Sequence, residues 1–75
     1  MTEQNIAALC VDAVGLATML DVSKRTVHRL DDGGRIPAGI SLGGCKRWRI
    51  EEIQAWMRAG APCRKEWQAI RGSAP

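Results

Sequence analysis

The first clear pattern of apolar and polar residues lies between Ala13 and Leu20. Leu16, Met19 and Leu20 are three and four positions apart, which places them on one face of a helix. Asp12 precedes the segment and is a suitable N-cap residue. The pattern predicts a short helix over 13–20 whose apolar stripe faces the core.

A second helical pattern follows after a break of only a few residues. Ser23 can cap a helix from Lys24 to Asp32, in which Val27 and Leu30 point back to the core. Gly33-Gly34 should end it, because glycine tolerates the left-handed conformation found at helix ends. Two short helices with a tight break between them predict a helix-turn-helix.

The next segment is typical of a β-hairpin. Pro37 disfavours helix at Ile36, and Gly43-Gly44 can form a tight turn between Leu42 and a second strand from Cys45 to Ile50. In that second strand, alternate residues lie on opposite faces of the sheet. We expect Trp48 and Ile50 to pack inward, Lys46 to swing out at the turn end of the same face, and Arg47 and Arg49 to share the other face.

A third helix is predicted over Glu51 to Ala59, ended by Gly60 and Pro62. Its expected buried stripe consists of Ile53, Trp56 and Met57. A short last helix is expected from Arg64 to Ile70, with Trp67 and Ile70 on one side. Trp67 could cover the open side of the domain or contact a neighbouring molecule, and we favour the first.

These elements divide the chain of 75 residues into three parts. Residues 1–11 are expected to be a flexible N-terminus, with the alternative that Cys10 and Val11 pack on the core. Residues 12–59 form the folded domain, and residues 60–75 form a C-terminal extension with a short helix and a tail. At this size the domain has little core to spare.

Positive charge is concentrated in the middle of the chain. The formal net charge is +3, and residues 23–50 hold seven of the eleven Lys and Arg residues but only two of the eight acidic ones. Such a distribution favours a surface that binds phosphate, although a solvated basic surface is the plainer alternative.

The sequence contains no recognisable metal, disulfide or catalytic pattern. Cys10, Cys45 and Cys63 are widely spaced, no CxxC occurs, and His28 is the only histidine. We therefore expect free thiols in a reducing cytoplasm, no cofactor, no metal site and no enzymatic activity. No signal peptide and no apolar run of membrane-spanning length is found, so no membrane association is expected.

Three segments together resemble a known family. LATMLDVSKRTVHRL, GRIPAGISLGG and RWRIEEIQAWM are similar to the AlpA-type regulators and phage excisionases, small winged-helix relatives of the MerR DNA-binding domain. The resemblance covers Asp12 to Met57, and GAPCRKEWQAI resembles the extension of some phage-encoded members. There are two departures: Asp21 stands where a glycine is usual in the turn, and Asp31-Asp32 place negative charge at the far end of the second helix.

The resemblance implies a mainly α fold with a small β-hairpin, a winged helix-turn-helix that binds double-stranded DNA. It places Ala17 where the two helices cross. Arg25 and Arg29 are four residues apart, as are Lys24 and His28, so both rows can face a DNA groove. The implied DNA-binding residues are Ser23, Lys24, Arg25, Thr26, His28 and Arg29 on the recognition helix and Lys46, Arg47 and Arg49 on the wing.

Two functions share this surface. The first is a transcriptional regulator of the AlpA type, bacterial or phage-encoded, that self-associates on DNA. The second is an excisionase that bends DNA at a recombination site and directs an integrase. A protein-interaction module without DNA binding is a third possibility, against which the basic helix argues.

Overall fold

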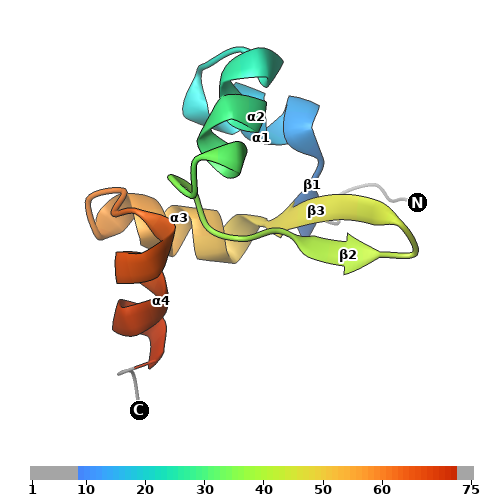
Figure 1. The fold of residues 1–75 in the computed structure, drawn as a ribbon. Coiled ribbons are helices and arrows are strands. Elements are labelled where there is room, and N and C mark those ends of the chain that lie inside the picture. Colours follow the sequence, from blue (N-terminus) through green and yellow to red (C-terminus); the bar gives the residue numbers. More distant parts are fainter. Residues whose placement is uncertain (1–8, 73–75) are drawn as a thin grey trace, which may run out of the picture.

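The computed structural model describes residues 9–72, so the expectations for residues 1–8 and for the tail at 73–75 lie outside the described residues (Figure 1). Within these residues, helices and a small antiparallel sheet form a winged helix-turn-helix, as predicted. In chain order the elements are β1 (Cys10–Val11), α1 (Ala13–Leu20), α2 (Lys24–Asp32), β2 (Ile40–Leu42), β3 (Cys45–Arg49), α3 (Ile50–Arg58) and α4 (Arg64–Gly72).

The helix-turn-helix formed by α1 and α2 occurs at the predicted residues, with the predicted caps. The Asp12 carboxylate accepts a hydrogen bond from the Gly15 backbone N–H at 2.9 Å, and the Ser23 hydroxyl accepts one from the Thr26 N–H at 3.1 Å. Asp21 adopts the left-handed conformation, with φ of 56°, at the end of α1. Aspartate tolerates this region better than most residues, so the turn keeps its form without a glycine.

The wing is larger than the predicted hairpin. Gly43 and Gly44 both have positive φ and join β2 to β3, as predicted, but β1 pairs with the other edge of β3. The sheet order is β1-β3-β2. A strand of two residues is too short to show alternation, so the sequence pattern did not predict it. Val11 packs against the core, which agrees with the alternative left open for this residue.

The core lies between the helices and one face of the sheet and is entirely apolar. It is formed by Leu16, Ala17, Val27, Ile36, Trp48, Ile53, Trp56 and Trp67. The three indole N–H groups all have acceptors: Trp48 donates to the Pro37 carbonyl at 3.0 Å, Trp56 to the Pro62 carbonyl at 2.7 Å, and Trp67 to Glu52 at 2.9 Å. Each tryptophan is therefore buried without an unsatisfied polar group.

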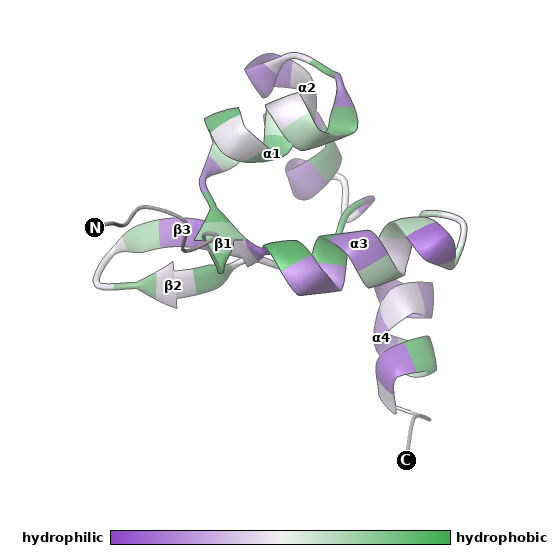
Figure 2. Ribbon diagram, turned by 180° about the vertical axis from the view of Figure 1, so that it is seen from behind, coloured by the Kyte–Doolittle hydropathy of each residue, from purple (hydrophilic) through white to green (hydrophobic). Residues whose placement is uncertain are grey.

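Two residues predicted to face the core, Met19 and Met57, do not, and Ile70, expected on the same side of its helix as Trp67, is exposed as well. Met19, Met57 and Ile70 are 39%, 49% and 48% exposed. Figure 2 shows hydrophobic and hydrophilic residues interleaved along α3 and α4. The buried residues of these helices are Ile53 and Trp56 on α3 and Trp67 on α4. In helices of eight or nine residues the covered stripe is narrow, and Met19 and Met57 fall at its rim, where they line a surface hollow between α1 and α3.

Ile50 also differs from the expectation. It was predicted to continue the strand and pack inward with Trp48, but β3 ends at Arg49 and Ile50 begins α3. The Ile50 N–H donates to the Leu9 carbonyl at 3.0 Å, and its side chain is only half-buried. The alternation of a strand no longer applies once the backbone turns into a helix.

The last helix belongs to the folded domain. α4 extends two residues beyond the predicted end, and Figure 1 shows it running away from the end of α3 at a steep angle. Trp67 is 5% exposed and is part of the core, in agreement with the favoured prediction that it covers the open side of the domain. Within residues 9–72, none of the helices has the length and apolar character needed to cross a membrane.

Candidate nucleic-acid interface

Helix α2, the second helix of the helix-turn-helix, divides into a buried side and a basic exposed side. Val27 is fully buried and Leu30 packs against the core, so these two residues fix which side of α2 faces the rest of the domain. The Lys, Arg and His side chains predicted to contact DNA from α2 all lie on the exposed side: Lys24, Arg25, His28 and Arg29. The first turn of α2 contains no acidic residue.

Ser23 and Thr26, also predicted to contact DNA, are engaged with each other. The Ser23 hydroxyl caps the helix through the Thr26 N–H, and the two hydroxyl oxygens are 2.9 Å apart. Ser23 is exposed and Thr26 is half-buried. This pair fixes the start of the helix, and contact of either hydroxyl with DNA stays a prediction.

The cations of the wing lie on two different faces of the sheet. Arg47 pairs with Ile40, and Arg49 with Cys10, on the face away from the core. The Arg47 guanidinium donates to the Lys46 carbonyl at 2.9 Å and is half-buried, whereas Arg49 is exposed. This arrangement agrees with the predicted alternation, since Trp48 between them points into the core.

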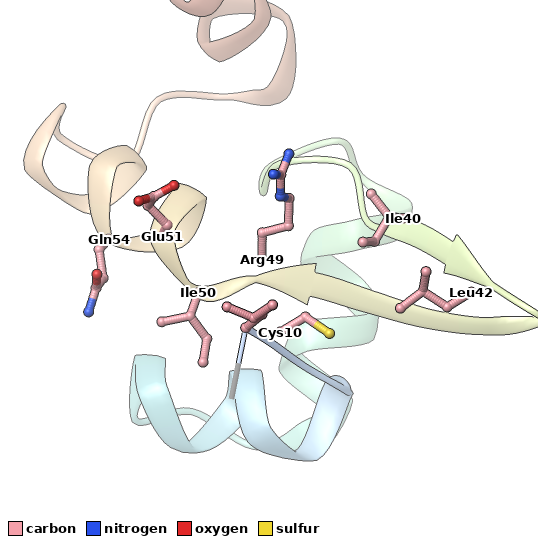
Figure 3. Close-up of a pocket in the computed structure, with 8 residues that line it drawn as sticks. Cys10, Ile40, Leu42, Arg49, Ile50, Glu51 and Gln54 are labelled. Atoms are coloured by element: carbon pink, nitrogen blue, oxygen red, sulfur yellow. The ribbon is translucent and has the colours of Figure 1, made fainter. Parts of the chain in front are cut away.

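A shallow apolar pocket occupies the outer face of the sheet beside Arg49 (Figure 3). Its apolar wall comes from both edge strands and the start of α3, and Arg49, Glu51 and Gln54 supply polar groups. The apolar lining residues are Leu9, Cys10, Ile40, Leu42 and Ile50. The pocket lies on the opposite side of the sheet from Trp48 and hence from the core.

Lys46 does not swing out as predicted. Its ammonium group is 2.5 Å from a carboxylate oxygen of Asp31 and 5.6 Å from the centre of the Trp48 ring. The prediction was wrong because it considered Asp31 only as a negative charge at the end of α2 and not as a partner for a cation of the wing. In the folded protein the carboxylate is directed at the wing, and it attracts the cation that alternation places on that face.

Arg64 completes this contact and was not among the predicted site residues. Its guanidinium is 2.7 Å from the other Asp31 carboxylate oxygen and donates to the Ile36 carbonyl at 3.0 Å and the Asp31 carbonyl at 3.2 Å. Asp31 and Arg64 are separated by 33 residues, so no local pattern could have paired them.

The opposite end of the helix-turn-helix carries a carboxyl whose pKa is lowered, that of Asp12. The hydrogen bond from the Gly15 N–H, assisted by the positive charges of Arg47 and Lys24, holds the pKa of Asp12 below its usual 3.8. This carboxyl is exposed, and its desolvation opposes the shift only in part. The ionised form is therefore the one that caps α1.

The described residues show little other chemistry. Cys10, Cys45 and Cys63 are free thiols, and no group of three His, Cys, Asp or Glu side chains between residues 9 and 72 is arranged to hold a metal ion. Chemically, the arrangement offers cations for phosphates and donors for base edges.

Comparison with known families agrees with the fold. A family model described as a helix-turn-helix domain matches residues 16–61, from the middle of α1 to the turn after α3. Searches of curated proteins and of solved structures find no match. The matched segment includes α2, the wing and α3, and it ends before Arg64 and α4. The chain thus belongs to the helix-turn-helix family of excisionase- and AlpA-like DNA-binding domains.

Proposed function

We propose that the protein is a sequence-specific binder of double-stranded DNA that acts as a small transcriptional regulator of the AlpA type, bacterial or phage-encoded and cytoplasmic. The observation that carries the proposal is the exposed basic face of α2, where Lys24, Arg25, His28 and Arg29 project from a helix anchored by Val27. A recognition helix reads base edges with its N-terminal residues, and these four residues lie in its first two turns.

Each group of cations has a distinct part in the proposal. Arg25 and Arg29 offer guanidinium forks, which match the two acceptors of guanine in the major groove. Arg47 and Arg49 bind backbone phosphates from the wing and set the orientation of the helix. Asp31 and Asp32 at the far end of α2 restrict base contact to its first two turns.

One helix and one wing make few contacts, so useful affinity requires several copies on adjacent or repeated sites. We expect a monomer to bind weakly and with little selectivity. Self-association on DNA is therefore part of the proposal.

The test is a gel-shift titration on DNA from beside the gene, repeated across a series of salt concentrations. Affinity should fall steeply with salt because each phosphate contact releases counterions. Arg47→Ala should weaken specific and random DNA alike. Arg25→Ala or Arg29→Ala should cost about 1–3 kcal/mol on the best site only, if that residue reads a base. A salt slope near zero for the unaltered protein would overturn the proposal.

The DNA-binding step is common to a regulator and to an excisionase. A footprint over a promoter, with altered expression of a reporter, supports the regulator. A footprint beside an integrase attachment site, with stimulation of excision in a recombination assay, would replace the regulator by an excisionase whose partner is an integrase.

A further inference from the structure

Three segments that are distant in the sequence meet at the Asp31 side chain. One carboxylate oxygen lies 2.5 Å from Lys46 on β3, and the other lies 2.7 Å from Arg64 at the start of α4. The Asp31 side chain is 11% exposed, against 28% for Arg64 and 54% for Lys46. The Asp31 carboxylate is thus the least exposed member of the cluster, and Lys46 is the most exposed.

Asp31 also occupies a special place on the recognition helix. Lys24, His28 and Asp31 are spaced by four and three residues, so they form one row along α2. Lys24 and His28 are exposed, and Asp31 bonds to the wing. The Asp31–Lys46 contact therefore joins the basic row of the helix to the wing.

Arg64 holds Asp31 in place through a fixed fork. The guanidinium donates to the Ile36 carbonyl, the Asp31 carbonyl and the Asp31 carboxylate, while the Arg64 N–H donates to the Gly34 carbonyl at 2.9 Å. These acceptors belong to the end of α2 and to the loop that leads to the wing. A planar group with several directed donors fixes this geometry, which a lysine cannot do.

We propose that Asp31 and Arg64 are positioning residues for DNA binding. Arg64 orients the Asp31 carboxylate, which holds Lys46 and so sets the wing against the recognition helix. By this means α4, which lies outside the matched family domain, takes part in DNA binding without touching DNA. The inference rests on the proposed function.

The physical benefit is preorganisation. A wing free to move relative to α2 would have to be ordered when it meets the phosphate backbone, and that ordering would weaken binding. A carboxylate that is 11% exposed and satisfied by two cations keeps the wing in one place before DNA arrives.

The first test compares two arginines of the same helix. Arg64→Lys keeps the charge but loses the fork. Arg71→Lys does the same at the contact between Arg71 and Glu52, which is 2.6 Å long and does not involve Asp31 or Lys46. We expect Arg64→Lys to weaken binding to the best site roughly tenfold, the effect of one well-placed charged hydrogen bond. Arg71→Lys should stay within about twofold.

This comparison separates positioning from direct contact. If Arg64 acted by contacting phosphate as a charge, lysine would preserve both the affinity and the salt slope. Affinity of Arg64→Lys equal to that of the unaltered protein therefore overturns the proposal. All titrations are run at a temperature where circular dichroism shows every variant to be fully folded, so that lost stability is not read as lost binding.

The second test compares two neighbouring aspartates. Asp31→Asn and Asp32→Asn each remove one negative charge from the end of α2, but Asp32 is exposed, whereas Asp31 holds the cluster. Charge alone would make both variants bind DNA more tightly. We expect tighter binding for Asp32→Asn, and for Asp31→Asn weaker binding with a smaller ratio of specific to random affinity. Equal gains for the two variants would overturn the proposal.

The two proposals fail in different ways. If the unaltered protein shows no salt-dependent affinity for DNA, the proposed function itself is wrong. If it binds DNA as proposed and the Arg64 and Asp31 variants bind as their controls do, only the positioning role is wrong.

Discussion

At the scale of single residues, Gly15 is a position where one close contact requires a glycine. Glycine inside a helix costs about 1 kcal/mol relative to alanine. A Cβ atom added to Gly15 would lie 2.7 Å from the Cβ of Val11, which is too close for two carbon atoms. The glycine is what allows β1 to approach the first turn of α1.

We therefore predict that Gly15→Ala destabilises the protein despite its better helix propensity, by about 1–3 kcal/mol, as overpacking does. Gly72→Ala is the matched control, since it adds a Cβ to another helical glycine that has nothing within 4 Å. Urea unfolding of both variants provides the measurement. Equal stability of Gly15→Ala and the unaltered protein would mean that β1 does not lie on α1 as described.

A second prediction at this scale concerns Asp12 and pH. Its pKa is lowered in the folded protein by the Gly15 N–H, so the ionised carboxylate stabilises the fold. This contribution is fully present above the ordinary pKa of 3.8 and is lost as pH falls through the lower folded value. Asp12→Asn removes the charge but keeps a capping oxygen.

The stability difference between the unaltered protein and Asp12→Asn should be constant from about pH 7 to about pH 5 and should shrink below the ordinary pKa. Thermal melts across this range measure it. A difference that grows on acidification would contradict the assigned direction of the shift.

At the scale of elements, the orientation of α2, the proposed recognition helix, depends on how α1 packs against it. Ala17 is 6% exposed and lies in the core, and its carbonyl accepts the Val22 N–H at 3.0 Å in the turn. The small side chain of Ala17 therefore lies close to the turn by which the chain passes from α1 into α2.

Ala17→Leu should lower stability by about 1–3 kcal/mol through overpacking. DNA binding should weaken as well, although no DNA contact is removed. Ala17→Ser is the conservative control and should have a much smaller effect. Circular dichroism melts beside DNA titrations test this, and normal melting and binding of Ala17→Leu would show that the helix pair is packed differently.

At the scale of the whole molecule, α4 closes the core. Trp67 is 5% exposed and donates to Glu52, which also accepts from Arg71 at 2.6 Å. Ile70, three residues later on the same helix, is 48% exposed. The buried apolar contact of α4 thus comes from Trp67 in its first half, while Arg71 adds an ion pair in its second half.

Trp67→Ala should therefore cost about 3–5 kcal/mol, the usual effect of truncating a buried aromatic residue. Such a loss threatens the fold of a chain this short. Ile70→Ala should remain within about 0.5 kcal/mol. Chemical unfolding of the two variants gives the comparison, and similar small losses would place Trp67 outside the core.

The amino-acid sequence by itself determined the local structure. The bounds of α1 and α2, the caps at Asp12 and Ser23, and the Gly43-Gly44 turn all follow from interactions within a few residues, and the structure confirms them. The same local patterns placed Lys24, Arg25, His28 and Arg29 on the exposed face of α2. Their contact with DNA stays a prediction.

Only the tertiary structure decided which partners meet across the chain. The exposure of Met19 and Met57 depends on how far each neighbouring element extends to cover them, and β1 exists because β3 offers it an edge. Asp31 bonds to Lys46, which is 15 residues away in the sequence, and to Arg64, which is 33 residues away. Helical or strand periodicity describes the faces of one element, whereas these contacts depend on where the fold brings two faces together.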